Sequence, residues 1–203
     1  MRRYIVNPPA VEPFALSEVK RWLRVDHVDD DQLISGLVRA ARERVEARTG
    51  RALLAQTWRI ILDQWPGDGQ VALPVMPALS VPAVRVANIS GLFNVIAPSS
   101  YILDIRLEPA VLTMSQIIQP ERLRGGIEID VIAGYGINPQ DCPESLRQAM
   151  LLMIVEAYSR RGPDQSVLQK APVNAEIERL LSPYSSIRLA SIAMKAHSEG
   201  ARR

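Results

Sequence analysis

The amino-acid sequence predicts an α+β fold in which a helical body of about four helices carries an inserted, small β-rich subdomain and ends in an extended C-terminal tail. Three observations lead to this prediction. Apolar residues follow helical spacing up to residue 49 and again after residue 143, strand-like alternation fills the segment between, and scattered apolar residues continue past residue 183. The chain therefore divides into an N-terminal arm (1–16), a helical body (17–54 and 139–183, two helices in each part), an insertion (55–138) and a tail (184–203).

The composition excludes several classes of protein. Apolar residues make up 47% of the 203 residues and charged residues 23%, which is ordinary for a soluble globular domain. The formal net charge of +2 is far from that of a protein that grips nucleic acid along a whole face. Cys142 is the only cysteine, which rules out an intrachain disulfide and a cysteine-based zinc site. No apolar run suffices for a signal peptide or a bilayer span, so we expect a soluble, cytoplasmic protein with no membrane partner.

The first part of the helical body follows an arm whose prolines predict an extended backbone. Ser17 is expected to cap a short helix over residues 18–24. The predicted inward face of this helix is Val19, Trp22 and Leu23. The acidic turn "VDHVDDD" then breaks the helix, and Asp29 or Asp30 is expected to cap the next one.

A second helix is predicted over residues 31–49, because apolar residues recur there at helical spacing. Its inward face is expected to hold Leu33, Ile34, Leu37, Val38, Ala41 and Val45. Its solvated face is expected to hold Arg39, Arg42, Glu43, Glu46 and Arg48, with weak ion pairs at a spacing of four residues. Gly50 is predicted to end the helix in the left-handed conformation, which glycine enters without steric cost.

The insertion is predicted to consist of short strands. Apolar and polar residues alternate most clearly in "QTWRIILD" and "IEIDVIA", and in the second of these Glu128 and Asp130 share the face opposite to the apolar side chains. Frequent prolines predict that the strands are short and often lie at sheet edges. The predicted strands are 57–62, 83–89, 101–105, 110–114 and 127–132.

The helix predicted over residues 143–161 is apolar on nearly every side. Pro143 suits its first position and Gly162 its end. Because a chain of this size offers little surface to cover such a helix, we expect a second copy of the protein to cover it. The candidate subunit-interface residues are Leu151, Leu152, Val155, Arg160 and Arg161. The two arginines also have a second interpretation, as solvated side chains that interact with the helix dipole.

The chain ends in a short helix, predicted over residues 173–181 and stopped by Pro183, and then in the tail. Four basic residues and one acidic residue give the tail a charge of 4 − 1 = +3. The tail is too hydrophobic for a solvated linker and too short to fold alone. Two interpretations stay open: a terminal helix packed on its own domain, or a segment that docks onto a partner and orders there.

No catalytic, metal or cofactor site is expected from the motifs. "DHVDDD" lacks the glycine and glutamate of a calcium loop, and "GYGINP" lacks the third glycine of a dinucleotide loop, so both are predicted to be turns. Cys142 precedes a helix, but no partner base is near in sequence. If the protein were a small enzyme with a site assembled between subunits, the nearest cluster would be Glu128, Asp130, Tyr135 and Cys142.

Five motifs follow one another along the chain: "ARTGRALLAQTW", "LPVMPALSV", "IDVIAGYG", "CPESLRQAMLLMIVEAYSRRG" and "IERLLSPYSSIRL". In this order they resemble the head–tail connector, or adaptor, proteins of tailed bacteriophages, in the form with a β-insertion found in siphophage-like prophages and gene transfer agents. The resemblance covers residues 17–189. The pattern E-x-x-T-G-R-x-L-x-x-Q-T-W, from Glu46 to Trp58, carries most of it.

The resemblance implies a structural protein, without enzymatic activity or cofactor, that is assembled in the bacterial cytoplasm and located in the neck of a virion. It implies a ring, expected to be twelve-fold, that binds the portal protein on one side and a tail-side connector or stopper protein on the other. DNA would pass through the channel without sequence-specific binding. Family members are similar in using C-terminal segments to reach the portal. This makes the candidate portal-binding residues Tyr184, Ile187, Arg188, Leu189, Ile192 and Met194.

Two other classes of function remain as alternatives. One is an oligomeric or peptide-binding adaptor module, unrelated to phage particles, that recognises partners through the strand edges of its insertion. The other is the small enzyme with an intersubunit site. Mass in solution separates a monomeric module from a stable ring, and alanine substitution of the acidic cluster tests for an enzyme.

Overall fold

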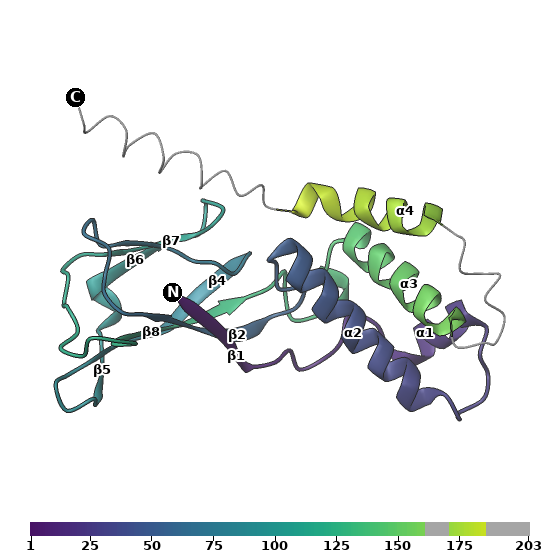
Figure 1. Ribbon diagram of the computed structural model, residues 1–203, viewed down its shortest axis with the longest axis horizontal. Coiled ribbons are helices and arrows are strands. Elements are labelled where there is room, and N and C mark those ends of the chain that lie inside the picture. The colour runs from purple at the N-terminus through teal and green to yellow at the C-terminus, as the bar shows by residue number, and fades with distance from the viewer. Residues whose placement is uncertain (161–170, 186–203) are drawn as a thin grey trace.

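Two separate hydrophobic cores organise the chain, one among helices and one between two β-sheets. The computed structural model describes residues 1–160 and 171–185. The helices gather at one end of an elongated molecule and the strands at the other, as Figure 1 shows. The α+β fold class predicted from the sequence, with two helices on each side of a β-rich insertion, is confirmed.

The helical body consists of α1 (Leu16–Leu23), α2 (Asp31–Thr49), α3 (Glu144–Ser159) and α4 (Ala171–Leu181). α3 lies between α2 and α4 and packs against both (Figure 1). The core of the helical body includes fully buried apolar side chains from α2, α3 and α4: Ile34, Val45, Leu146, Met150, Ile154 and Leu181. Within the described residues, no helix is both long enough and apolar enough to span a bilayer.

The ends of α1 and α2 differ in detail from the prediction. Ser17 does not cap α1, because the helix begins at Leu16, two residues earlier than predicted, and Ala15 holds the cap position without a side-chain hydrogen bond. Asp30 is at the cap position of α2, but its carboxylate accepts a hydrogen bond of 2.6 Å from the Tyr158 hydroxyl on α3 instead. Gly50 ends α2 in the left-handed conformation (φ 70°), as predicted.

Trp22 does not face inward as predicted; 63% of its surface is exposed. The inward face of α1 holds Val19, which is fully buried, with Leu16 and Leu23 partly buried against the same core. These three residues lie at spacings of three and four, so one narrow face suffices to attach this short helix. Trp22 consequently lies on the flank that faces solvent.

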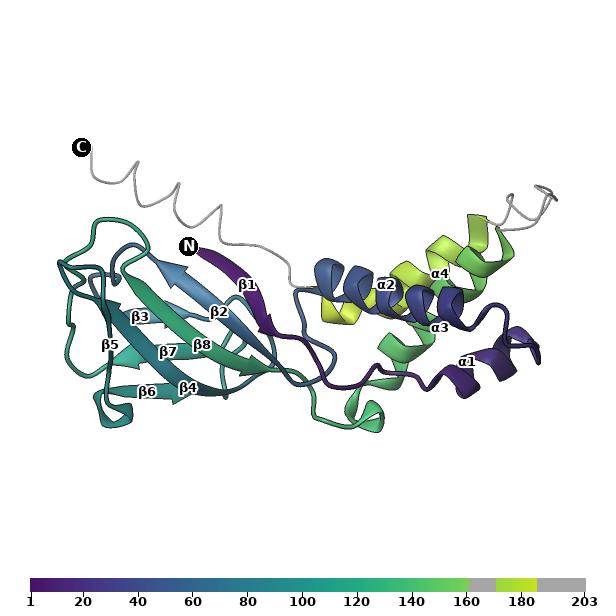
Figure 2. The ribbon, with the colours of Figure 1, turned by 90° about the horizontal axis from the view of Figure 1, so that it is seen from below.

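The β-rich unit contains two antiparallel sheets. The larger has the order β1-β2-β8-β4-β5 and is formed by β1 (Arg2–Asn7), β2 (Gln56–Leu62), β8 (Ile127–Ala133), β4 (Ala78–Ala87) and β5 (Phe93–Val95). The smaller has the order β3-β7-β6 and is formed by β3 (Gln70–Ala72), β7 (Val111–Met114) and β6 (Tyr101–Asp104). The two sheets form two layers (Figure 2) and share one core. Short 3₁₀ turns cover Pro98–Ser100, Pro139–Asp141 and Ser182–Tyr184.

All five predicted strands are present, with ends shifted by a few residues. β4 begins earlier than predicted and runs past Pro82, because irregular pairing with β8 around Ser80 accommodates a residue without an amide donor. The sequence missed β1, where the predicted extended arm pairs with β2 as an edge strand. It also missed β3 and β5, which are three residues long and too short to show alternation.

The β-rich unit leaves and rejoins the helical body at neighbouring points of the chain. Gln56, the first residue of β2, pairs directly with Ala133, the last residue of β8. The connections on either side also touch, since the Ala55 amide donates to the Gly136 carbonyl over 2.7 Å. The insertion is therefore tied to the helical body through two strands that lie side by side.

Candidate partner interfaces

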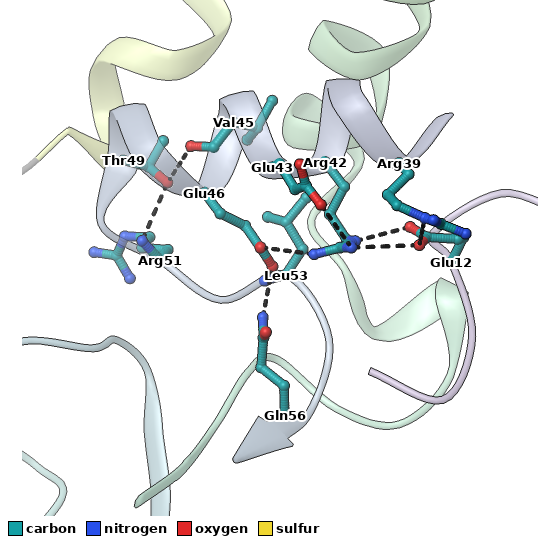
Figure 3. A network of polar contacts seen from close by, with 10 residues as sticks. All are labelled: Glu12, Arg39, Arg42, Glu43, Val45, Glu46, Thr49, Arg51, Leu53 and Gln56. Carbon is teal, nitrogen blue, oxygen red and sulfur yellow. Dashed lines mark hydrogen bonds and ion pairs between the residues drawn. The ribbon is translucent and has the colours of Figure 1, made fainter. Parts of the chain in front are cut away.

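A buried carboxylate, Glu46, holds the helical body to the start of the insertion (Figure 3). One of its oxygens accepts hydrogen bonds from the Leu53 amide (2.9 Å) and the Gln56 side chain (2.7 Å). The other accepts from Arg42 over 2.9 Å, and Arg42 in turn binds Glu12 of the N-terminal arm over 2.8 Å. Burial raises the pKa of Glu46, although these donors oppose the shift. The network joins the arm, α2 and β2.

The burial of Arg42 and Glu46 corrects the prediction that both lie on the solvated face of α2, because their exposed fractions are 4% and 8%. The arm and the segment after Gly50 cover this part of the helix. Thr49 supports the same turn, since its hydroxyl donates to the Val45 carbonyl (2.8 Å) and accepts from the Arg51 amide (3.2 Å). The motif from Glu46 to Trp58 is thus largely a set of junction contacts.

Arg51 joins three distant segments at the root of the tail. Its guanidinium forms two hydrogen bonds with Glu108, of 3.2 and 2.7 Å, in the loop after β6. It also donates to the Tyr135 hydroxyl (3.3 Å) and to the Tyr184 carbonyl (3.2 Å), and it lies over the Tyr184 ring. The hydrogen bonds from Arg51 lower the pKa of Glu108. This contact fixes where the tail leaves the body.

Of the six candidate portal-binding residues, the structure describes only Tyr184. It is half-buried against the helical core and held by Arg51. The other five lie outside the described residues: Ile187, Arg188, Leu189, Ile192 and Met194. Their predicted role in binding a portal stays a prediction.

The candidate subunit-interface residues differ in their exposure. Leu151 is buried within its own chain (7% exposed), in a helix that packs against α2 and α4. Leu152 and Val155 are partly exposed and remain candidates for contact with a neighbour. Arg160 pairs with Glu156 on its own helix, which favours the second interpretation of that arginine. Arg161 lies outside the described residues.

Exposed apolar side chains gather in loops of the β-rich unit. Ile89 and Leu92, between β4 and β5, are 85% and 66% exposed, and Leu123, in the loop before β8, is 86% exposed. The two loops lie side by side, because the Ile89 amide donates to the Glu121 carboxylate over 2.6 Å and the Glu121 amide donates to the Ala87 carbonyl. These loops, 88–92 and 117–123, are called the distal loops below. Sequence reasoning missed them, because separate loops show no shared pattern.

The cluster considered for an enzyme is not assembled as a site. Asp130 is bound by Arg59 and Arg85 on the outer face of the larger sheet, and Tyr135 contacts Arg51. Cys142 is buried in the helical core, where burial raises the pKa of its thiol to about 12, opposite to the shift that a nucleophile needs. Among the described residues, no group of histidine, cysteine and acidic side chains could hold a metal ion.

Asp130 instead stabilises the larger sheet through its ion pairs with Arg59 and Arg85. Desolvation raises the pKa of Asp130, but hydrogen bonds from Arg59 and Arg85 (2.7 Å each) lower it by more. Replacing Asp130 by Asn should therefore reduce the free energy of unfolding by about 2 kcal/mol at pH 7. Because the folded pKa is below the unfolded value near 4, the loss should shrink as the pH falls through the folded pKa. Urea unfolding of both proteins at pH 7 and pH 3 measures the loss of stability and its dependence on pH. An equal loss at the two pH values would contradict a stabilising role for the Asp130 carboxylate.

Comparisons with known proteins found one family model and several solved structures that are similar to this chain. A family model described as phage gp6-like head-tail connector protein matches residues 14–90. No curated protein matches the chain. Among solved structures, the chain is similar to the neck of a native GTA particle computed with C12 symmetry, at 26% identity and a TM-score of 0.71. It is also similar to the neck of an empty GTA particle computed with C6 symmetry, at 23% identity and a TM-score of 0.77. A third similar structure is the virion of a native gene transfer agent particle, at 24% identity and a TM-score of 0.68.

Each of these similarities covers 93% of this chain and 97% of the other chain. The family model spans α1, α2 and the first strands of the insertion, and the solved structures extend the likeness over nearly the whole fold. Together they confirm the resemblance to the phage head–tail connector family that the sequence predicts.

Proposed function

We propose that this protein is a structural adaptor in the neck of a phage-like particle, where copies form a ring between the portal protein and a tail-side connector or stopper protein. The observation that carries the proposal is the likeness to the neck of a native GTA particle over 93% of the chain at 26% identity. That neck was computed with C12 symmetry, which supports a twelve-fold ring here. Its place would be the virion neck, after assembly in the bacterial cytoplasm.

The exposed surfaces fit the three contacts that a ring subunit makes. Leu152 and Val155 offer a partly exposed apolar stripe to a neighbouring copy, in an interface that closes by rotation. The distal loops, at the β-rich end, suit a tail-side partner, because exposed bulky apolar side chains mark interaction sites. The tail begins at Tyr184, just after α4 and against the helical core, so it leaves from the helical body and suits the portal. A net charge of +2 suits a channel through which DNA must slide, since a strongly basic wall would bind its phosphates.

Removing residues 186–203 is expected to lower the affinity for the portal by at least about 100-fold, because it deletes the apolar anchors and leaves the described fold intact. Co-sedimentation of the purified portal with the full chain and with the truncated chain measures the effect, and electron microscopy of the mixture shows whether a ring forms.

A full-length chain with Ile89→Ser and Leu123→Ser is the matched control, since both residues lie in the distal loops. This control should bind the portal like the unaltered chain. Portal binding that survives the truncation, or that is lost in the control, would reject the assignment of the tail to the portal.

A further inference from the structure

A groove of about 280 Å³ lies between β1, the C-terminal half of α2 and the start of β2. Its walls are mostly apolar, and they include Ile5, Ala47, Ala52, Trp58 and Val75. Acidic side chains stand beside them: Glu46 is buried in the junction network, whereas the Glu43 side chain is 62% exposed at the rim. Figure 3 shows both side chains on α2, with Glu43 beside Arg42; Arg51, just after the helix, also lines the groove.

Trp58 carries an unsatisfied donor at this groove. Its indole nitrogen is shielded from solvent and finds no hydrogen-bond acceptor among the described residues. Trp65, the other tryptophan of the β-rich core, donates to the Ile118 carbonyl over 2.9 Å. An unpaired buried donor costs free energy, so this one points to an acceptor that the described residues do not supply. The guanidinium of Arg3 lies 5.5 Å from the centre of the Trp58 ring and donates to the Pro74 carbonyl.

We propose that residues 186–203 of the same chain occupy this groove before the portal is met, with Leu189 seated between Ala47 and Trp58. The described chain ends at Ser185, directly after Tyr184, and Tyr184 is held by Arg51 of the groove wall. Leu189 is the fourth residue after Ser185, which gives it a reach of up to about 14 Å from a root that Arg51 of the groove wall already holds.

The composition of the segment matches the groove. In "IRL", Ile187 and Leu189 flank Arg188, so an extended backbone directs two apolar side chains to one face and a cation to the other. The apolar face suits the groove walls. The lining holds two glutamates and two arginines, so the match of charge is limited to Glu43, whose exposed carboxylate lies 3.8 Å from Arg42 and is open to a further cation such as Arg188. The backbone carbonyls of the segment are acceptors of the kind that the Trp58 indole lacks. The occupied groove would keep the apolar tail covered until a partner takes it.

Disulfide trapping in the full-length chain tests the contact. Ala47→Cys with Leu189→Cys should form an intramolecular disulfide at least ten times faster than Ala40→Cys with Leu189→Cys. Ala40 is the matched control, because it is also an exposed alanine on α2 and lies about 10 Å further along the helix, outside the groove. The buried Cys142 does not interfere, because its thiol is inaccessible. Equal rates for the two pairs, or disulfides that form only between chains, would overturn the proposal.

The Trp58 indole N–H resonance gives a second readout without cysteines. It should move downfield in the full-length chain relative to a full-length variant with Ile187, Leu189, Ile192 and Met194 all changed to Ser, while the Trp65 resonance stays in place. An unchanged Trp58 resonance counts against occupation of the groove.

The inference rests on the proposed function only in its last step, the release of the tail by the portal. Adding purified portal should slow the trapping at Ala47→Cys. If trapping is specific but the portal leaves its rate unchanged, the groove contact stands and the proposed role of the tail at the portal fails.

Discussion

Replacing Glu46 by Ala is expected to lower the free energy of unfolding by about 3 kcal/mol, because the change breaks a buried charge pair. The Arg42 guanidinium would keep Glu12 but lose its buried partner, and the Leu53 amide and the Gln56 side chain would both lose their acceptor. Buried donors left without an acceptor are costly. Urea unfolding followed by circular dichroism measures the loss.

Glu43→Ala is the matched control for this prediction. Glu43 stands one turn earlier on α2 and its side chain is 62% exposed, so its removal should change stability by less than about 0.5 kcal/mol. A similar loss in both variants would mean that removing any carboxylate from this part of α2 is costly, and that the junction network does not set the effect of Glu46.

Replacing Gly134 by Ala is expected to cost at least about 3 kcal/mol, since two separate penalties combine. Gly134 has φ of 145°, a conformation that residues with a side chain rarely adopt. A Cβ there would lie 2.4–2.5 Å from backbone atoms of Leu54 and Ala55, which side-chain motion cannot relieve. The clash would push apart the two strands that connect the helical body to the insertion. Thermal and urea unfolding detect the change.

Gly36→Ala provides the opposite expectation within the same chain. Gly36 is exposed within α2, and nothing lies within 4 Å of the position of its missing Cβ. Alanine there should stabilise the protein by about 0.5–1 kcal/mol through higher helix propensity. If Gly134→Ala proved as harmless as Gly36→Ala, the close approach at the junction would not constrain the fold.

Local patterns sufficed to predict the elements whose residues interact with their sequence neighbours. The bounds of α2 and the left-handed Gly50 follow from helical spacing and from backbone sterics, both of which act within a few residues. The strands around Ile60 and Ile129 follow from alternation across one buried face. The edge strand β1 was missed because all six of its residues are exposed, and so no apolar pattern marks it.

The interfaces could not be predicted in the same way, because their residues come together only in the folded chain. Arg42 and Glu46 have the spacing of a surface ion pair, and only the arm and the segment after Gly50 bury them. Arg51 meets Glu108, Tyr135 and Tyr184 from positions up to 133 residues apart. The apolar character of α3 predicted burial, and Leu151 is buried within its own chain, whereas the contact of Leu152 and Val155 with a second copy stays a prediction.

The direct pairing of Gln56 with Ala133 has a consequence for how such proteins diversify. Antiparallel partners have Cα atoms about 5 Å apart, so a short connection could replace everything between them without moving α2 or α3. Selection can then lengthen, shrink or exchange this module to match a new partner while the helices keep their packing. Chimaeras that swap the segment between relatives at these two positions would keep a cooperative helical unit.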